Sequence, residues 1–167
     1  MKQVILGIGN SLNGDDGIGV YVVQRILQQL QGAEGDPEQA EAAGISGIVA
    51  IDCGRTPENY TSVIRKHNPD RLILVDAAYM GVRPGSYRVV PPQEIDVMHV
   101  STHDVPLSVF VSYVGEFCRD VVLVGIEPHR MDFGTALSRA VRRGGDEVAR
   151  LIIEQRLNEI RPLEMCT

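Results

Sequence analysis

The chain has 167 residues, with 22 acidic and 16 basic side chains, a formal net charge of −6 and three cysteines. This length predicts a single domain over residues 1–167, and the acidic balance disfavours a nucleic-acid-binding protein, because phosphate binding needs clustered basic side chains. The cysteines lack the CxxC spacing of a zinc site, and neither a secretory signal nor an apolar run of about 18 residues is found, so we expect a cytoplasmic protein that does not enter a membrane.

The first half of the chain alternates apolar runs with segments of helical spacing. Three short runs rich in β-branched residues are typical of strands buried on both faces: residues 4–8, 47–52 and 71–76. Apolar residues recur at helical spacing between positions 20 and 30, and Pro57 begins a second helical pattern. Residues 32–44 are small and acidic without periodicity, so we expect an exposed connection there.

The second half continues this alternation. A run at residues 87–90 is bounded by prolines and predicts an edge strand. Helical spacing follows at 107–117, a buried strand at 120–126, and a last helix from about 135 to 160, in which Gly144-Gly145 predicts a kink or break. The whole pattern predicts an α/β fold, a three-layer sandwich with a mainly parallel, twisted sheet of about five strands between helices.

Polar side chains follow the predicted strands at the points where each strand ends. These are Asp15 and Asp16 after the first strand, Asp52 and Asp76 at the ends of the second and third, and His103 before a helix. Ligands of open α/β sheets bind outside the carboxyl ends of the strands, so these residues are the candidates for chemistry. Carboxylates and an imidazole together suit a borderline divalent cation such as nickel, zinc or ferrous iron.

Each candidate also has a purely structural interpretation. Asp15 or Asp16 could cap the first helix, Asp52 and Asp76 could anchor loops by accepting backbone N–H groups, and His103 could be an exposed surface residue. A dinucleotide site after the first strand is disfavoured, because Leu12 replaces the third glycine of GxGxxG and two acids would repel a pyrophosphate. Neither a GxSxG nor an HExxH motif is found, so a serine hydrolase or a conventional zinc peptidase is not indicated.

Five sequence blocks together resemble a known family. The segment GIGNSLNGDDGIG, residues 7–19, is similar to the opening signature of the [NiFe]-hydrogenase maturation endopeptidases. The resemblance continues in family order through four further blocks: Asp52-Cys53-Gly54, Leu74-Val75-Asp76-Ala77, residues 101–107 and residues 124–128. The ordered set extends over residues 3–155, and it is most similar to the branch that processes formate-linked and energy-converting hydrogenases.

The resemblance implies a nickel-dependent endopeptidase that removes the C-terminal extension of a [NiFe]-hydrogenase large-subunit precursor after nickel insertion. It implies nickel ligation by Asp16, Asp76 and His103, with the nickel supplied by the precursor, and a role for Asp52 or Asp76 in orienting the attacking water. The family usually has glycine at the position of Cys53, which is either a spurious nickel ligand or an ordinary small buried residue. A non-catalytic module that binds nickel and precursor as a checkpoint is the alternative, and a monomer is expected.

Overall fold

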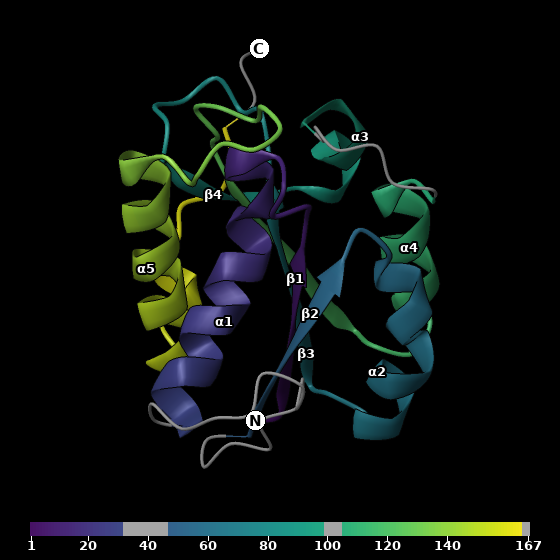
Figure 1. The fold of residues 1–167 in the computed structure, drawn as a ribbon. Helices are drawn as coiled ribbons and strands as arrows, with labels where there is room; N and C mark the ends of the chain where they lie inside the picture. Colours follow the sequence, from purple (N-terminus) through teal and green to yellow (C-terminus); the bar gives the residue numbers. More distant parts are fainter. Residues whose placement is uncertain (32–46, 99–104, 165–167) are drawn as a thin grey trace.

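Five strands form one sheet with the spatial order β2-β1-β3-β5-β4. The computed structural model describes residues 1–31, 47–98 and 105–164 (Figure 1). The strands are β1 (Gln3–Ile8), β2 (Ile48–Gly54), β3 (Arg71–Ala77), β4 (Tyr87–Val90) and β5 (Asp120–Ile126). The first four in spatial order run parallel, and β4 runs antiparallel to β5. The mainly parallel α/β sandwich predicted from the sequence is confirmed.

Helices cover both faces of this sheet (Figure 1). One face carries α1 (Ile18–Gln31) and α5 (Arg139–Ile153), and the other carries α2 (Thr61–His67), α3 (Ile95–Met98) and α4 (Leu107–Val114). Four short 3-10 helices complete the described elements: η1 (Gly14–Gly17), η2 (Pro57–Tyr60), η3 (Pro92–Glu94) and η4 (Leu157–Glu159). The predicted connection at residues 32–44 lies outside the described residues.

The central strands are apolar on both sides because each side packs against a helical layer. In β1, Ile5 belongs to the core under α1 and α5, whereas Val4 and Leu6 belong to the core under α2 and α4. Successive side chains of a strand point to opposite faces, so a strand between two cores must be a continuous apolar run. This explains why the sequence of β1 shows no polar alternation.

The predicted edge strand is confirmed. β4 forms one margin of the sheet, and its outer side is covered by the chain that follows η4. The Val89 N–H donates to the Arg161 carbonyl at 2.9 Å, and the Leu163 N–H donates to the Val89 carbonyl at 2.8 Å. These bonds satisfy backbone groups that an open edge would expose for pairing with other chains.

The prediction for the last helix is wrong in two respects. α5 begins at Arg139 and ends at Ile153, and it continues through Gly144-Gly145 without a break. A Cβ on Gly144 would lie 2.0 Å from the Gly85 carbonyl oxygen, and one on Gly145 would lie 2.8 Å from Ile18 Cδ1. These glycines therefore allow close packing, which outweighs the low helix propensity of glycine.

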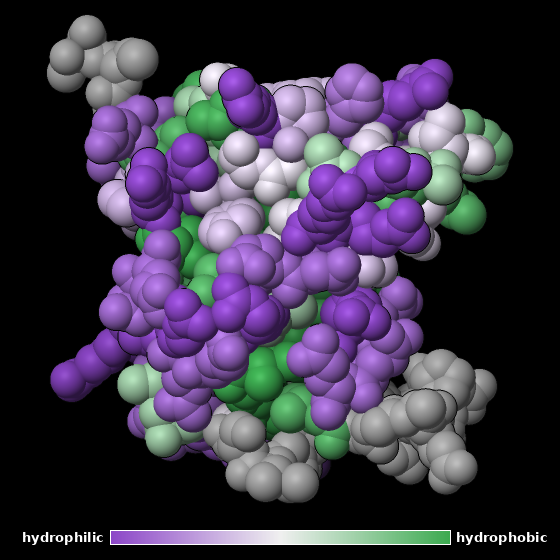
Figure 2. Space-filling view, turned by 90° about the vertical axis from the view of Figure 1, so that its left-hand side faces the viewer, coloured by the Kyte–Doolittle hydropathy of each residue, from purple (hydrophilic) through white to green (hydrophobic). Residues whose placement is uncertain are grey.

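The outer face of the α1 and α5 layer is mostly hydrophilic (Figure 2). Four arginines of α5 are exposed on it: Arg139, Arg142, Arg143 and Arg150. They are spread along a helix side that faces solvent, as expected for the polar side of an amphipathic helix. In the described parts of the chain, every helix is too short or too polar to cross a bilayer.

Candidate functional site

The carboxyl ends of β1, β2 and β3 lie side by side (Figure 1). This end of the sheet is called the carboxyl edge below, and it is distinct from the edge strand β4. Gly7 of β1 pairs with Asp52 on one side and with Val75 on the other, so Asp52 and Asp76 flank the end of β1. The η1 segment that carries Asp16 contacts β3. The topology thus brings Asp16, Asp52 and Asp76 to the same edge, as the strand-end rule predicts.

Asp15 connects two loops that are far apart in sequence. Its carboxylate is fully buried and accepts the N–H groups of His129 at 2.9 Å, Arg130 at 2.7 Å and Ser138 at 2.7 Å, and also the Ser138 hydroxyl at 2.7 Å. Burial by itself raises the pKa of Asp15, but these donors outweigh burial and hold the pKa below its ordinary value. Asp15 is therefore an ionised structural clamp rather than a helix cap.

Asp16 is fixed at the end of β1. It is 5% exposed, and its Oδ2 accepts the N–H of Asn10 at 3.3 Å. Gly9 makes this tight loop possible, because it adopts a φ of 143° and a Cβ there would lie 1.9 Å from the Asp16 carbonyl oxygen. The two neighbouring aspartates thus bind to different partners and have different surroundings.

Asp76 and Asp52 both accept a nearby backbone N–H, as the structural interpretation predicts. Asp76 is 1% exposed, and its Oδ1 accepts the N–H of Ala77 at 2.8 Å. Asp52 is half-buried, and its Oδ1 accepts the N–H of Gly54 at 2.9 Å. A carboxylate has room for several acceptor contacts, so one such bond is compatible with a further role for either residue.

His103 lies outside the described residues, so its place relative to Asp16 and Asp76 remains a prediction. Before His103 in the chain, the Met98 carbonyl accepts the N–H of Tyr79 at 3.0 Å. After His103, the Ser108 hydroxyl donates to the Asp96 carboxylate at 2.8 Å. Within residues 1–31, 47–98 and 105–164, no three His, Cys, Asp or Glu side chains are close enough to hold a metal ion. The described carboxylates therefore need a ligand from elsewhere to complete a metal site.

Cys53 is a buried core residue. Its side chain is 3% exposed and belongs to the apolar core on the α2 and α4 side of the sheet. Burial raises the pKa of its thiol far above the usual range, and the nearby charges of Asp52 and Glu58 raise it further. A cysteine that binds a metal does so as a thiolate, so the structure favours the small buried residue over the spurious ligand.

Glu127 is a buried acid to which the sequence analysis assigned no role. It follows β5 directly, is 5% exposed, and accepts the N–H of Met80 at 3.1 Å with each oxygen and that of Val82 at 3.0 Å. These bonds fix the connection that leaves β3 just after Asp76. An acid directly after a buried strand is the signal that pointed to Asp52 and Asp76, so the same rule could have found Glu127.

Comparisons with known proteins agree on one family. A family model described as hydrogenase maturation protease matches residues 23–155. The hydrogenase 3 maturation protease of Escherichia coli K12 is 32% identical over 143 residues, which are 85% of this chain and 83% of that protein. The solution structure of an endopeptidase HycI from Escherichia coli superposes with a TM-score of 0.80 at 28% identity, covering 98% of this chain and 97% of that one.

A second solved structure is also similar. The crystal structure of a [NiFe] hydrogenase maturation protease HycI from Thermococcus kodakarensis KOD1 matches with a TM-score of 0.74 and 30% identity. The match covers 93% of this chain and 92% of that chain.

Proposed function

Because this chain belongs to the hydrogenase maturation protease family, we propose that it is an endopeptidase that removes the C-terminal extension of a [NiFe]-hydrogenase large-subunit precursor after nickel insertion. The observation that carries the proposal is the pair of buried carboxylates, Asp16 and Asp76, at the shared edge of β1 and β3. Buried acids cost solvation energy, and a bound divalent cation offsets that cost.

The nickel belongs to the substrate in this proposal. Asp16, Asp76 and His103 would complete the coordination of an ion that substrate cysteines already hold. Two carboxylates and one imidazole suit nickel, and cysteine thiolates would come from the precursor, because the described Cys53 is a buried thiol. A precursor without nickel would lack the charge that draws it to these acids, so nickel would gate cleavage.

Hydrolysis also needs a group that orients water. We assign this role to Asp52, with Asp76 as the other candidate. Asp52 is half-buried, so water can reach it, and its Oδ1 contact to Gly54 fixes the side chain. A carboxylate in this position can accept a proton from the water as its oxygen attacks the scissile carbonyl carbon. The carbon–nitrogen bond then breaks, and the leaving nitrogen takes up the proton.

The direct test is to incubate the protein with precursor in its nickel-loaded and nickel-free forms and to weigh the products by mass spectrometry. The proposal expects a released C-terminal peptide only with the loaded precursor. Binding of the loaded precursor without release would indicate the checkpoint module. An intact precursor beside an active homologue as control would contradict the protease.

A further inference from the structure

Exposed apolar side chains gather at the same edge of the sheet as the candidate carboxylates. Among the described residues, seven large hydrophobic side chains are exposed, and four of them are on segments at this edge: Leu12, Tyr79, Val97 and Phe133. Phe133 is 80% exposed and Leu12 is 62% exposed. Clustered apolar exposure is a mark of an interaction surface, whereas single exposed residues are ordinary.

The two loops that carry Leu12 and Phe133 are joined to each other. The Gly134 N–H donates to the Leu12 carbonyl at 2.8 Å, and the Asp15 N–H donates to the Arg130 carbonyl at 2.8 Å. Figure 1 shows the loop between β5 and α5 lying over the N-terminal end of α1. Leu12 and Phe133 thus form one surface feature, which we name the apolar pair.

Hydrogen bonds to the backbone hold the Phe133 loop in place. The Asp15 carboxylate binds the Phe133 loop at both ends, through Arg130 on one side and Ser138 on the other. Within this loop, Thr135 donates its N–H and its hydroxyl to the Asp132 carbonyl, at 3.2 Å and 2.6 Å. A loop held in this way keeps Phe133 exposed, so a contact with another molecule would carry a low ordering cost.

We infer that the apolar pair docks an apolar segment of the precursor polypeptide beside the cleavage site. The inference rests on the proposed function. Leu12 lies between Asn10, whose N–H binds the Asp16 carboxylate, and Asp16 itself, so the pair adjoins the proposed nickel-binding edge. The nearest described charges on the Phe133 loop, Arg130 and Asp132, form an ion pair at 3.4 Å. This pairing leaves the surface with little net charge, which suits an apolar partner better than a charged one.

The inference is tested by measuring binding and cleavage separately. We would determine Kd for the nickel-loaded precursor with the wild type, Leu12→Ser and Phe133→Ser, and in parallel record peptide release. Val109→Ser is the matched control, because Val109 is 55% exposed on α4 and does not belong to the apolar pair. Each apolar-pair variant should weaken binding about tenfold or more, while the control stays within about twofold. Melting temperatures should stay unchanged, since exposed side chains contribute little to the core.

The outcomes separate the docking inference from the proposed function. Weakened binding in both variants supports docking even if no peptide is released, a result that would contradict only the cleavage. Equal affinities for wild type and variants would overturn docking while cleavage stands. Sedimentation of the free protein gives a further readout. If the wild type is a dimer that Phe133→Ser dissociates, and if the affinity for the precursor is unchanged, the apolar pair binds a second copy of the chain. That result would also overturn docking.

Discussion

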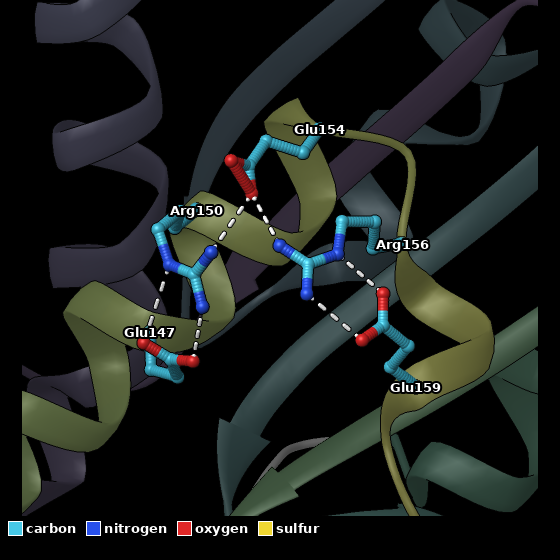
Figure 3. A network of polar contacts seen from close by, with 5 residues as sticks. All are labelled: Glu147, Arg150, Glu154, Arg156 and Glu159. Carbon is cyan, nitrogen blue, oxygen red and sulfur yellow. Dashed lines mark hydrogen bonds and ion pairs between the residues drawn. The ribbon is translucent and has the colours of Figure 1, made fainter.

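Carboxylates are held in two contrasting ways at two ends of this molecule. Beyond the middle of α5, three exposed glutamates pair with Arg150 and Arg156 in a network that joins α5 to η4 (Figure 3). Arg150 contacts Glu147 at 2.5 Å and Glu154 at 2.9 Å, and Arg156 contacts Glu154 at 2.9 Å and also Glu159. At the carboxyl edge of the sheet, by contrast, Asp15 is buried and accepts only backbone N–H groups and one hydroxyl.

The two ends differ in what stabilises the carboxylate charge. In the α5–η4 network each glutamate contacts a guanidinium, and all five side chains are between 40% and 47% exposed, so water and salt screen the pairs. Backbone N–H groups stabilise the charge of Asp15 but carry no net charge themselves. The charge of Asp15 is therefore stabilised by dipoles, whereas the glutamates of the α5–η4 network are stabilised by opposite charges.

The largest expected effect on folding stability is that of Asp15→Ala. The substitution leaves four donors from three residues without their acceptor in a buried place, and we expect it to lower the free energy of unfolding by about 3–5 kcal/mol. Denaturant titration measures the change. Asp15→Asn keeps one acceptor oxygen and should lose less. A loss under about 1 kcal/mol for the alanine variant would contradict the clamp.

Glu127→Ala should have the next largest effect, about 1–3 kcal/mol, because it removes the acceptor of the Met80 and Val82 N–H groups. Glu127→Gln retains one carbonyl oxygen and serves as the matched control with a smaller loss. Denaturant titration with hydrogen exchange at Met80 and Val82 checks both statements. Unchanged exchange at these amides in the alanine variant would show that Glu127 does not hold the connection.

Acid should destabilise the protein through Asp15. Its pKa is lower in the folded state than the ordinary value of 3.8, so the ionised clamp contributes its full stability above about pH 4 and loses it as the pH falls through the lower folded value. The melting temperature of the wild type, recorded from pH 6 downwards, should fall as the pH decreases. The melting temperature of Asp15→Asn should fall less steeply. Parallel curves for the two proteins would contradict the lowered pKa.

Arg156→Ala should have the smallest effect, a shift in melting temperature of no more than about 2 °C, although the guanidinium contacts two glutamates. Hydrogen bonds from Arg156 lower the pKa of Glu159, but this pair is exposed and screened. Adding 1 M salt should remove the difference from wild type. A fall in melting temperature as large as that of Asp15→Ala would contradict the expected difference between the exposed ion pairs and the buried Asp15 carboxylate.

Local sequence patterns predicted most of the fold. The apolar run of β1 reflects burial on both faces, and the prolines beside β4 reflect a strand at the margin of the sheet; both are short-range requirements. Helix propensity predicts a break at Gly144-Gly145, but propensity describes an isolated helix, whereas in the fold the close packing against Gly85 and Ile18 requires glycine. Packing between distant segments is not encoded in the local pattern.

The candidate site, like the fold, could be predicted only in part from the sequence. The strand-end rule placed Asp52 and Asp76 at one edge but could not separate Asp15 from Asp16. The partners of Asp15 are 114 to 123 residues away along the chain, so no spacing rule reveals the clamp. The family resemblance selected Asp16 as the ligand, and the structure assigns Asp15 a separate structural task.

The central claim is that Asp16 binds nickel while its neighbour Asp15 holds the fold. The most direct measurement is peptide release from nickel-loaded precursor by Asp16→Asn, with the melting temperature of the same sample. We predict at least about a hundredfold slower release, since loss of even a residue that supports a metal ligand costs tenfold to a hundredfold, and a melting temperature close to that of wild type. Release at the wild-type rate would contradict the claim, and so would unfolding of the variant.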